Sequence, residues 1–436
     1  MLKHAGTPGR GLRRCGSSDT TIKCGDSDGL NRATRTSWVP VDFSPRNGWC
    51  QPSTPPRPCA SRDTRSGNGR IYRAASSATL AAMAKPLVGI TMGDPLGIGP
   101  EVVVKALADA AVRGSARFVI YGDNELLLAA AEQARVHPTW FRASIDHARD
   151  GSMVLGDLTV IDYGVAGTLG SAHEPTKAGG VASKTFVEDA IVDAMRPASD
   201  PRRLDAIVTA PISKESWALA GFRWPGHTEL FAARTRAKRQ AMAFVSPRLK
   251  VVLATTHVPL LELRNLLTIG RVHEPVVLGD ELCRQLGIAS PRIAVCGLNP
   301  HAGENGLFGD EEIRVIKPAI DLARAGGIDV HGPFSGDTIF IDAAAGAWDL
   351  VVAMYHDQGL IPVKLLGWDK AVNVTLGLPI VRTSPDHGTA FGIAGQSKAS
   401  EGSMRAAVEL AVRLVSQGAA AGTGARQLGA GDSDAT

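Results

Sequence analysis

The sequence predicts an α/β fold built on a largely parallel sheet. Short, continuous apolar runs of strand length recur from residue 86 onward, and a turn and a helix-like segment follow each run. Runs that alternate with helices in this way are typical of parallel strands buried on both faces. A chain of 436 residues allows two to three lobes. Charged residues interrupt the apolar runs, so no stretch approaches the roughly 20 apolar residues of a membrane span.

The first 82 residues differ in composition from the rest of the chain. They hold 13 Lys and Arg against 5 Asp and Glu, which is +8, whereas the whole chain carries +4. Residues 83–436 are therefore net acidic, at −4. Residues 1–82 are rich in Arg, Ser, Gly and Pro without apolar periodicity, so we expect a disordered basic extension. A targeting segment, a nucleic-acid-binding arm and sequence upstream of a true start at Met83 are the three alternatives, and we favour the last.

Two further features concern the ends and the cysteines. Residues 417–436 are rich in Ala, Gly, Ser and Asp, and we expect a flexible tail there. Four of the six cysteines lie in the basic extension without a CxxC spacing, which leaves Cys283 and Cys296 in the remainder. Such sparse cysteine usage is typical of a reduced compartment, so we expect a cytoplasmic protein.

The first predicted strand covers residues 87–91 and runs into a glycine-rich turn, MGDPLGIG (92–99). A helix is predicted from Pro100, because proline favours the first helical position. Glycines at a helix N-terminus let the backbone approach an anionic ligand. The turn is neither a complete GxGxxG motif nor a Walker loop, and a plain strand-to-helix turn explains it equally well.

Four later strands are predicted to end in chemically useful side chains. The apolar runs cover residues 204–208, 249–254, 292–296 and 349–354. Lys214 follows the first run, and His257, His301 and His356 follow the other three. Ligands bind beyond the carboxyl ends of parallel strands. Three neutral imidazoles converging there suit zinc, cobalt or manganese better than magnesium and leave open positions for a substrate. The alternative is a cluster of hydrogen-bonded loop histidines without a metal.

Other polar residues stand in otherwise apolar or glycine-rich sequence. His227, within PGHTEL, is either a fourth metal ligand or a substrate contact. Lys364, Asn373 and Arg382 offer a point charge, an amide and a guanidinium fork, which suit phosphate and carboxylate groups. Each can equally be a solvated surface residue. The small-residue loop 385–395 either approaches a planar ring or diphosphate, or is a surface turn.

Six motifs in this order resemble the 4-hydroxythreonine-4-phosphate dehydrogenase family. They are GITMGDPLGIGPEVVVKAL (89–107), PGHTELF (225–231), ATTHVPL (254–260), GLNPHAGE (297–304), MYHDQGLIPVK (354–364) and VNVTLGLPIVRTSPDHGTA (372–390). The resemblance covers about residues 86–416 and does not extend to residues 1–82.

The resemblance implies two α/β/α lobes of the isocitrate/isopropylmalate dehydrogenase type rather than a Rossmann domain. It implies a first lobe on the cofactor side, residues 83–212 and 385–416. The second lobe, residues 213–384, would hold substrate and metal and form a homodimer with its active site at the subunit interface. The missing GxGxxG motif agrees with this fold.

The resemblance also assigns site residues. The implied metal ligands are His257, His301 and His356, so a fourth-ligand role for His227 is dropped. The implied substrate-binding residues are His227, Thr228, Lys364, Asn373 and Arg382. The implied cofactor-binding residues are His387, Gly388, Thr389, Ala390 and Gly395. The residues near the reacting centre are Lys214, Asp337 and Asp357, of which Lys214 and Asp357 are alternatives for proton transfer. Leu96 and Gly392 depart from the family's usual Ala and Asp.

The implied reaction is the oxidation and decarboxylation of 4-phosphooxy-L-threonine to 3-amino-2-oxopropyl phosphate, a step of vitamin B6 biosynthesis. It uses NAD, with NADP as the alternative, and one divalent metal per site, either zinc, cobalt or magnesium. A dehydrogenase of D-threonate or D-erythronate 4-phosphate shares these motifs and stays an alternative. A zinc hydrolase leaves the anion-binding residues and the DHGTA loop unexplained. The acidity of residues 83–436 argues against nucleic-acid binding, so we expect neither a nucleic acid nor a membrane as a partner.

Overall fold

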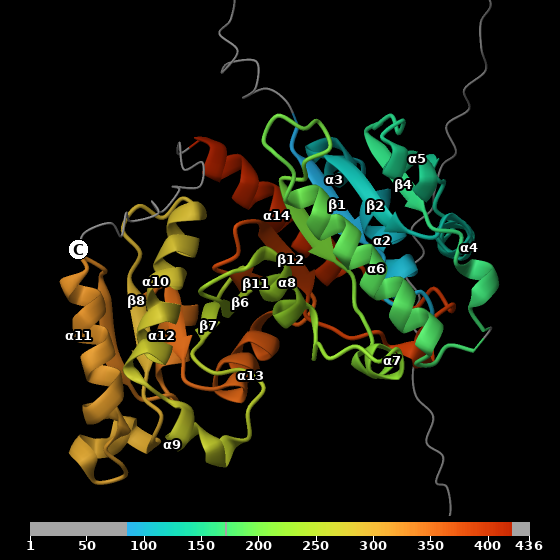
Figure 1. The fold of residues 1–436 in the computed structure, drawn as a ribbon. Helices are drawn as coiled ribbons and strands as arrows, with labels where there is room; N and C mark the ends of the chain where they lie inside the picture. Colours follow the sequence, from blue (N-terminus) through green and yellow to red (C-terminus); the bar gives the residue numbers. More distant parts are fainter. Residues whose placement is uncertain (1–84, 171, 421–436) are drawn as a thin grey trace, which may run out of the picture. The chain divides into compact units, whose positions relative to one another are not determined.

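The computed structural model describes residues 85–170 and 172–420, which belong to one compact unit (Figure 1). The predicted basic extension, residues 1–82, lies outside the described residues. The predicted tail begins inside a helix, α14 (Gly402–Ala420), and only residues 421–436 lie outside the described part. The helix continues through residues 417–420, where two alanines, which have the strongest helix propensity, follow Gln417 and Gly418.

The described strands form one twelve-stranded sheet in the order β3-β4-β2-β1-β5-β12-β11-β6-β7-β10-β8-β9. Their bounds are β1 (Leu87–Thr91), β2 (Arg117–Gly122), β3 (Phe141–Ser144), β4 (Leu158–Asp162), β5 (Ala206–Thr209), β6 (Ala241–Val245), β7 (Lys250–Leu253), β8 (Ile293–Cys296), β9 (Val330–Phe334), β10 (Leu350–Ala353), β11 (Val372–Leu376) and β12 (Val381–Pro385).

The predicted, largely parallel sheet is confirmed. Antiparallel pairing is confined to the middle of the sheet, where β11 pairs with β12 and β6, and β6 pairs with β7. The apolar runs that predicted strands became β1, β5, β7, β8 and β10, each within two residues of the expected bounds. The predicted lobe boundary between residues 384 and 385 falls inside β12, which pairs with β5 on one side and β11 on the other. The division into two lobes stays a prediction.

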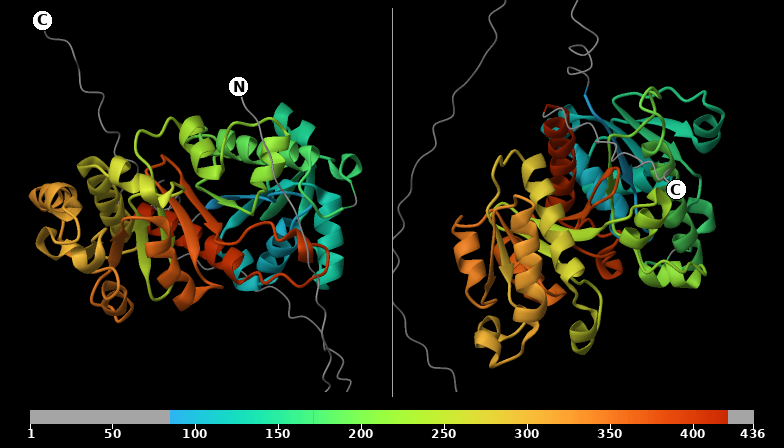
Figure 2. Two further views of the ribbon diagram at one scale, coloured as in Figure 1. Left: turned by 90° about the horizontal axis from the view of Figure 1, so that it is seen from below. Right: turned by 60° about the vertical axis from the view of Figure 1, so that its left-hand side comes forward.

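Helices cover both faces of the sheet. Along β10, Leu350 and Val352 belong to one apolar core, whereas Val351 and Ala353 belong to a second. Alternate residues of a strand face opposite sides of the sheet, so apolar layers lie on both sides of this strand. Two further views show helices on either side of the strands (Figure 2). This is the arrangement that continuous apolar runs predict.

The helices follow the strands in the chain order expected of an α/β protein. The α-helices are α2 (Gly99–Ala108), α3 (Ala110–Ser115), α4 (Asn124–Ala134), α5 (Ile145–Asp150), α6 (Lys177–Ala194), α7 (Lys214–Leu219), α8 (His227–Thr235), α9 (Leu263–Leu266), α10 (Ile269–Gln285), α11 (Lys317–Ala325), α12 (Ile339–Ala344), α13 (His356–Gly367) and α14. Short helical turns are η1 (Ala166–Thr168), η2 (Leu260–Glu262), η3 (Pro300–Gly306), η4 (Glu312–Ile316) and η5 (Phe391–Ile393). Among the described helices, none has both the length and the apolar character needed to cross a membrane.

Candidate active site

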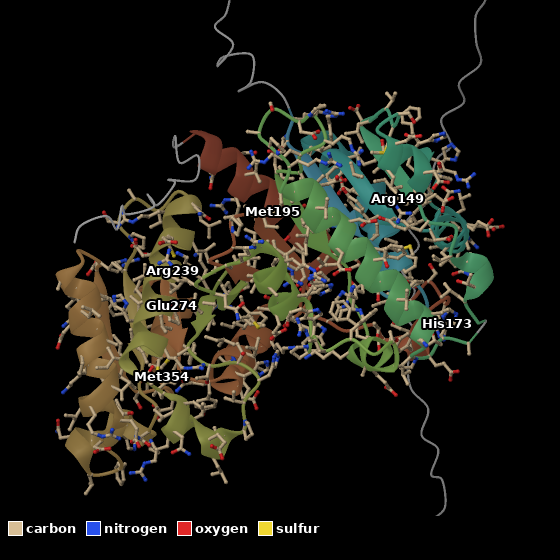
Figure 3. The ribbon with its side chains drawn as sticks, viewed as in Figure 1. Arg149, His173, Met195, Arg239, Glu274 and Met354 are labelled. Carbon is tan, nitrogen blue, oxygen red and sulfur yellow. The ribbon has the colours of Figure 1, made fainter. Side chains whose placement is uncertain are left out.

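The ends of β7 and β10 bring two of the predicted metal ligands together. His257 follows β7 and His356 begins α13 after β10, and their ring centroids lie 5.5 Å apart. The Thr255 hydroxyl donates a 2.7 Å hydrogen bond to the carbonyl of Met354 (labelled in Figure 3), which ties the two strand ends together. Burial lowers the pKa of His257, and the positive charge of Lys214 lowers it further. His257 is therefore neutral near pH 7, as a metal-binding imidazole must be.

Asp357 orients His356. Its Oδ1 lies 2.8 Å from His356 Nδ1. An ionised carboxylate only accepts hydrogen bonds, so Nδ1 is the donor of this contact, and in the neutral ring Nε2 then has the lone pair. Metal-binding histidines commonly have a carboxylate partner of this kind. This contact favours orientation of His356 over proton transfer as the role of Asp357.

The third histidine lies on an unusual turn after β8. Residues 301–305 all have positive φ angles, including 52° at His301, although only Gly303 among them is a glycine. A buried carboxylate holds the start of this turn, because Glu312 Oε1 accepts the backbone N–H groups of Leu298 at 2.8 Å and Asn299 at 2.7 Å. The Asn299 side chain donates to Glu312 Oε2 at 2.9 Å.

The three histidines do not form a single cluster. Across residues 85–170 and 172–420, no group of three or more His, Cys, Asp or Glu side chains is placed to hold a metal ion. Within one chain, His257, His301 and His356 are therefore not placed as a single ligand group among the described residues. The physical reason is that His301 follows β8, on the far side of β10 from β7, and lies on its own left-handed turn. Their assignment as metal ligands stays a prediction.

Asp337 lies on the His301 side of this region. The Ser335 hydroxyl donates a 2.6 Å hydrogen bond to Asp337 Oδ1, and this bond holds the pKa of Asp337 below its usual value. The positive form of His301 contributes to the same shift, so the two side chains are within electrostatic reach of each other. Asp337 is consequently an ionised, exposed carboxylate near His301.

Arg382 is buried within the sheet at the junction of three strands. Its side chain is 2% exposed and lies on β12. Nη1 donates to Thr375 Oγ1 at 3.0 Å and Nη2 donates to Thr209 Oγ1 at 2.6 Å, whereas Nε has no hydrogen-bond partner among the described residues. Burial lowers its pKa to about 9, which leaves the guanidinium charged near neutral pH. A charged fork held in this way suits a phosphate or carboxylate.

His227 and Asn373, near Arg382, each have an unpaired polar atom. His227 Nε2 and Asn373 Oδ1 are buried and lack hydrogen-bond partners within the described residues. Burial and the charge of Arg382 hold the pKa of His227 well below its usual value. Buried polar atoms are normally paired, so unpaired ones identify positions for a ligand. Thr228 lies next to His227 in the first turn of α8.

Lys364 forms an ion pair with a carboxylate. Its Nζ lies 3.2 Å from Asp386 Oδ2, which belongs to the loop after β12, and 5.0 Å from the Trp368 ring centroid. Burial raises the pKa of Asp386, and the charge of Lys364 opposes that shift. The pair connects α13 to the predicted cofactor loop.

The predicted cofactor loop lies against the glycine-rich turn. The Ile98 N–H donates a 2.9 Å hydrogen bond to the Thr389 carbonyl. A Cβ on Gly97 would lie 2.9 Å from that carbonyl oxygen, so only glycine allows this close approach. His173 (labelled in Figure 3) covers the same turn, with Nδ1 2.8 Å from the Leu96 carbonyl. The structure thus brings together residues 94–99 and 387–395.

Within that loop, the predicted residues occupy strained or unpaired positions. Ala390 and Gly395 have φ angles of 43° and 70°. His387 Nδ1 lies 3.1 Å from the Gly388 carbonyl, and its Nε2 is buried without a partner among the described residues. These features suit a loop shaped around a ligand.

Comparison with known proteins identifies the family. The family described as pyridoxal phosphate biosynthetic protein PdxA matches residues 114–411. The D-threonate 4-phosphate dehydrogenase of Salmonella typhimurium is 44% identical over 330 residues, which is 75% of this chain and 98% of the relative. The chain belongs to the PdxA family. The 4-hydroxythreonine-4-phosphate dehydrogenase of Desulfosudis oleivorans is also 44% identical over 330 residues, 75% of this chain and 96% of the relative.

A solved structure agrees with the PdxA assignment. The crystal structure of a 4-hydroxythreonine-4-phosphate dehydrogenase from Klebsiella pneumoniae matches with a TM-score of 0.65 and 42% identity. The match covers 76% of this chain and 98% of that one. The resemblance inferred from the motifs and its dehydrogenase class are confirmed. The chain is an oxidoreductase, and its class implies a nicotinamide cofactor.

Several residues around the PdxA-family site were not predicted. Thr209, Asp386 and Glu312 act through contacts between distant elements, and although Asp386 belongs to the quoted DHGTA loop, no motif indicates these contacts. Glu229 was part of the quoted motif PGHTELF, where a carboxylate directly after His227 and Thr228 was the available signal.

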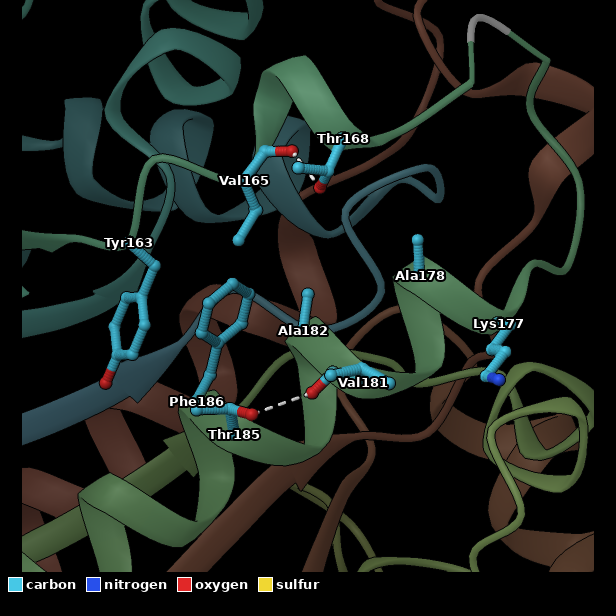
Figure 4. Close-up of a pocket in the computed structure, with 9 residues that line it drawn as sticks. All are labelled: Tyr163, Val165, Thr168, Lys177, Ala178, Val181, Ala182, Thr185 and Phe186. Carbon is cyan, nitrogen blue, oxygen red and sulfur yellow. Dashed lines mark hydrogen bonds between the residues drawn. The ribbon is translucent and has the colours of Figure 1, made fainter.

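A separate cavity of about 480 Å³ lies between η1 and α6 (Figure 4). Its lining is mainly apolar, with Tyr163 and Val165 on one side and Ala182 and Phe186 of α6 on the other. None of the predicted site residues lines it.

Proposed function

We propose that this chain catalyses the NAD-dependent, divalent-metal-dependent oxidation and decarboxylation of 4-phosphooxy-L-threonine to 3-amino-2-oxopropyl phosphate. This is the vitamin B6 reaction that the motifs imply. The observation that carries the proposal is the buried, doubly hydrogen-bonded Arg382 beside the unpaired His227 and Asn373, close to strand ends that carry histidines. Relatives bear the names 4-hydroxythreonine-4-phosphate dehydrogenase and D-threonate 4-phosphate dehydrogenase, so the second substrate stays a candidate.

The proposed substrate contacts follow from charge and hydrogen-bonding capacity. Arg382 and Lys364 neutralise the phosphate and carboxylate of the substrate. His227, Thr228 and Asn373 fix its orientation through their donors and acceptors. The buried guanidinium needs no reorganisation when the anion arrives, because Thr209 and Thr375 already hold it.

Lys214 is proposed as the proton-transfer group of the reacting centre. It is exposed, and it makes no hydrogen bond or ion pair with the described residues, whereas Asp357 is committed to His356. Its charge acts on His257, which places it within electrostatic reach of the reacting centre. When bound, the nicotinamide accepts the hydride. We propose NAD, with NADP as the alternative, and place His387, Gly388, Thr389, Ala390 and Gly395 near it.

The donor set fits a divalent metal, either zinc, cobalt or magnesium, although one chain does not complete the site. His257 is neutral near pH 7 and His356 offers a free Nε2, which are the properties of imidazole ligands. A bound divalent metal supplies a positive charge that stabilises the developing alkoxide and polarises the new carbonyl. We propose that His257, His301 and His356 act together only in a homodimer.

Exposed apolar side chains support the homodimer. They lie on the segments that carry or follow the three histidines: Leu261 is 91% exposed after His257, Leu307 is 73% exposed after His301, and Leu365 is 81% exposed on α13. Large apolar side chains exposed next to an incomplete site indicate a surface that is buried by a partner.

A cytoplasmic location is proposed on the free thiols of Cys283 and Cys296, whose pKa values burial raises to about 12.

The test is the formation of NADH by chelator-treated enzyme, with and without added zinc, cobalt or magnesium. The substrates are 4-phosphooxy-L-threonine, D-threonate 4-phosphate and D-erythronate 4-phosphate. We expect metal-dependent reduction with 4-phosphooxy-L-threonine, and we expect His301→Ala to abolish it without unfolding the protein. Absence of NADH with every substrate and metal would overturn the dehydrogenase reaction proposed here.

A further inference from the structure

Glu229 is a carboxylate without a partner in the candidate active site. It is the third residue of α8 and lies in its first turn. It forms neither a hydrogen bond nor an ion pair with any described residue. The other carboxylates of this region differ: Asp337 accepts from Ser335, Asp357 contacts His356, and Asp386 pairs with Lys364. Glu229 is therefore available to an incoming donor.

The charge of Glu229 acts both on a proposed metal ligand and on the proposed anion-binding arginine. The negative charge of Glu229 raises the pKa of His257 and that of Arg382, opposing the effect of burial at each. Electrostatic influence of this kind falls off with distance, so the carboxylate lies near both groups. It acts on both the proposed metal ligand and the proposed anion-binding guanidinium, and neither is within ion-pair distance of it.

Gly226 keeps space open beside the carboxylate. A Cβ on Gly226 would lie 3.5 Å from Glu229 Oε2 and 3.7 Å from Lys214 Cε, and no other atom outside its chain neighbours would come within 4 Å. The φ angle of Gly226 is 176°, which any residue adopts, so the backbone does not require glycine. The missing side chain leaves a gap between Glu229 and the stem of Lys214.

Stabilisation of α8 alone does not explain all the observations on Glu229. A glutamate in the first turn favours the helix through its dipole by about 0.3 to 1 kcal/mol. In a capping box the side chain would also accept the N–H of the residue before the helix. Neither Gly226 nor any other described residue donates to it here. The helical role also leaves its electrostatic effect on both His257 and Arg382 without a function.

We propose that Glu229 binds the 2-ammonium group of the substrate and makes the enzyme prefer a 2-amino over a 2-hydroxy phosphorylated acid. This inference rests on the proposed function and deepens it. The two candidate substrate types both carry a phosphate and a carboxylate, which the cations of the site bind alike. They differ at carbon 2, where one carries a charged ammonium and the other a neutral hydroxyl. A carboxylate favours the ammonium through a charge-assisted hydrogen bond.

The test compares Glu229→Gln with the wild type on both substrates. Glutamine keeps the size of the side chain and removes its charge. We expect kcat/KM for 4-phosphooxy-L-threonine to fall about 10- to 100-fold, as for loss of a hydrogen bond to a charged group. For D-threonate 4-phosphate, we expect kcat/KM to change less than about threefold, because the glutamine amide also forms a hydrogen bond with a neutral hydroxyl. Glu125→Gln, the same change in the exposed first turn of α4, is the matched control.

A binding measurement keeps this inference separate from the reaction. O-phospho-L-serine and 3-phospho-L-glycerate share the configuration at carbon 2 and differ there by ammonium against hydroxyl, and calorimetry measures their affinities without turnover. We expect the wild type to prefer phosphoserine and Glu229→Gln to lose that preference while keeping its melting temperature. Equal losses on both substrates, or an unchanged preference for phosphoserine, would overturn the role of Glu229. Turnover of neither substrate by the wild type would instead count against the proposed function, and the calorimetry would still decide on Glu229.

Discussion

The ammonium of Lys364 lies 3.2 Å from the carboxylate of Asp386, so a cation proposed to bind the substrate is already paired with the loop after β12. Lys364 belongs to α13, which begins with His356, whereas Asp386 directly precedes the predicted cofactor residues 387–390. One ion pair therefore links the substrate side of the site to the cofactor side. An anionic group arriving at Lys364 must compete with Asp386.

Replacing Asp386 with Asn should strengthen anion binding at Lys364. The amide leaves the cation without its counterion, and a partly exposed pair of this kind contributes up to about 1 kcal/mol. We expect the inhibition constant of inorganic phosphate, measured against the phosphorylated substrate, to fall about two- to fivefold. In a Lys364→Ala background, the same change should have no effect. An equal effect in both backgrounds would show that Asp386 acts by another route.

Replacing Arg382 with Lys should weaken both stability and substrate binding. A single ammonium cannot reach Thr209 and Thr375 in the geometry of the fork, and it leaves buried hydroxyl groups unpaired. We expect the free energy of unfolding to fall by about 1 to 3 kcal/mol and kcat/KM to fall at least about 100-fold. Urea unfolding and steady-state kinetics measure the two effects.

Thr209→Val is the matched variant for this prediction, because it removes one acceptor and leaves the guanidinium. It should lower kcat/KM less than Arg382→Lys does. A wild-type kcat/KM in Arg382→Lys would show that Arg382 serves only the packing of the sheet.

Unfolding should depend on pH through His227. Its folded-state pKa lies well below the usual 6.5, because burial and Arg382 disfavour the charged form. The unfolded chain therefore takes up a proton first as the pH falls. The stabilising contribution is complete above pH 6.5 and decreases below it, by up to about 1.4 kcal/mol per pH unit. His227→Gln should show a shallower loss of stability between pH 6.5 and pH 5 in urea unfolding. Parallel profiles for the two proteins would contradict this.

Gly226→Ser should make α8 more stable and the enzyme less active. Serine is a preferred residue before a helix, and glycine there makes no side-chain hydrogen bond. The gain over glycine is a few tenths of a kcal/mol. The added side chain enters the gap between Glu229 and Lys214, so we expect KM for the phosphorylated substrate to rise several-fold. A calorimetric melting curve and a KM measurement test the two effects. An unchanged KM would show that no substrate group occupies this gap.

Leu365→Asp should dissociate the proposed homodimer and reduce metal binding together. Leu365 is 81% exposed on α13, and burying a leucine side chain contributes about 1.5 to 3 kcal/mol. We expect light scattering to show a dissociation constant at least about tenfold higher, and metal content per chain to fall in parallel. Leu128→Asp, at a 40% exposed position on α4, is the control. Full metal content in a monomeric variant would place the whole metal site within one chain.

The strand predictions were correct where burial on both faces makes the sequence continuously apolar. Residues 87–91 became β1 without change, and the run 349–354 became β10 with one residue fewer at each end. β3 (Phe141–Ser144) and β9 (Val330–Phe334) lie at the two edges of the sheet and are partly exposed, so they have no such run. Edge strands carry a weak sequence signal for this physical reason.

The site was predictable in its residue types but not in its pairings. Histidines after apolar runs indicated strand ends, and the structure places His257 and His356 there side by side. The contact of Lys364 with Asp386 depends on how two elements pack, which no motif records. The separation of His301 from the other two depends on a turn with positive φ angles, which residues other than glycine rarely adopt.

That turn has a consequence for the order of folding. Left-handed backbone costs non-glycine residues roughly 1 to 2 kcal/mol each, so a peptide cut from residues 299–307 would not keep this shape. The carboxylate that accepts its N–H groups, Glu312, comes later in the chain at the start of η4. The start of the turn gains these hydrogen bonds only when η4 packs against η3. The native position of His301 therefore depends on a carboxylate that follows it in the chain, so the turn and η4 must take their places together.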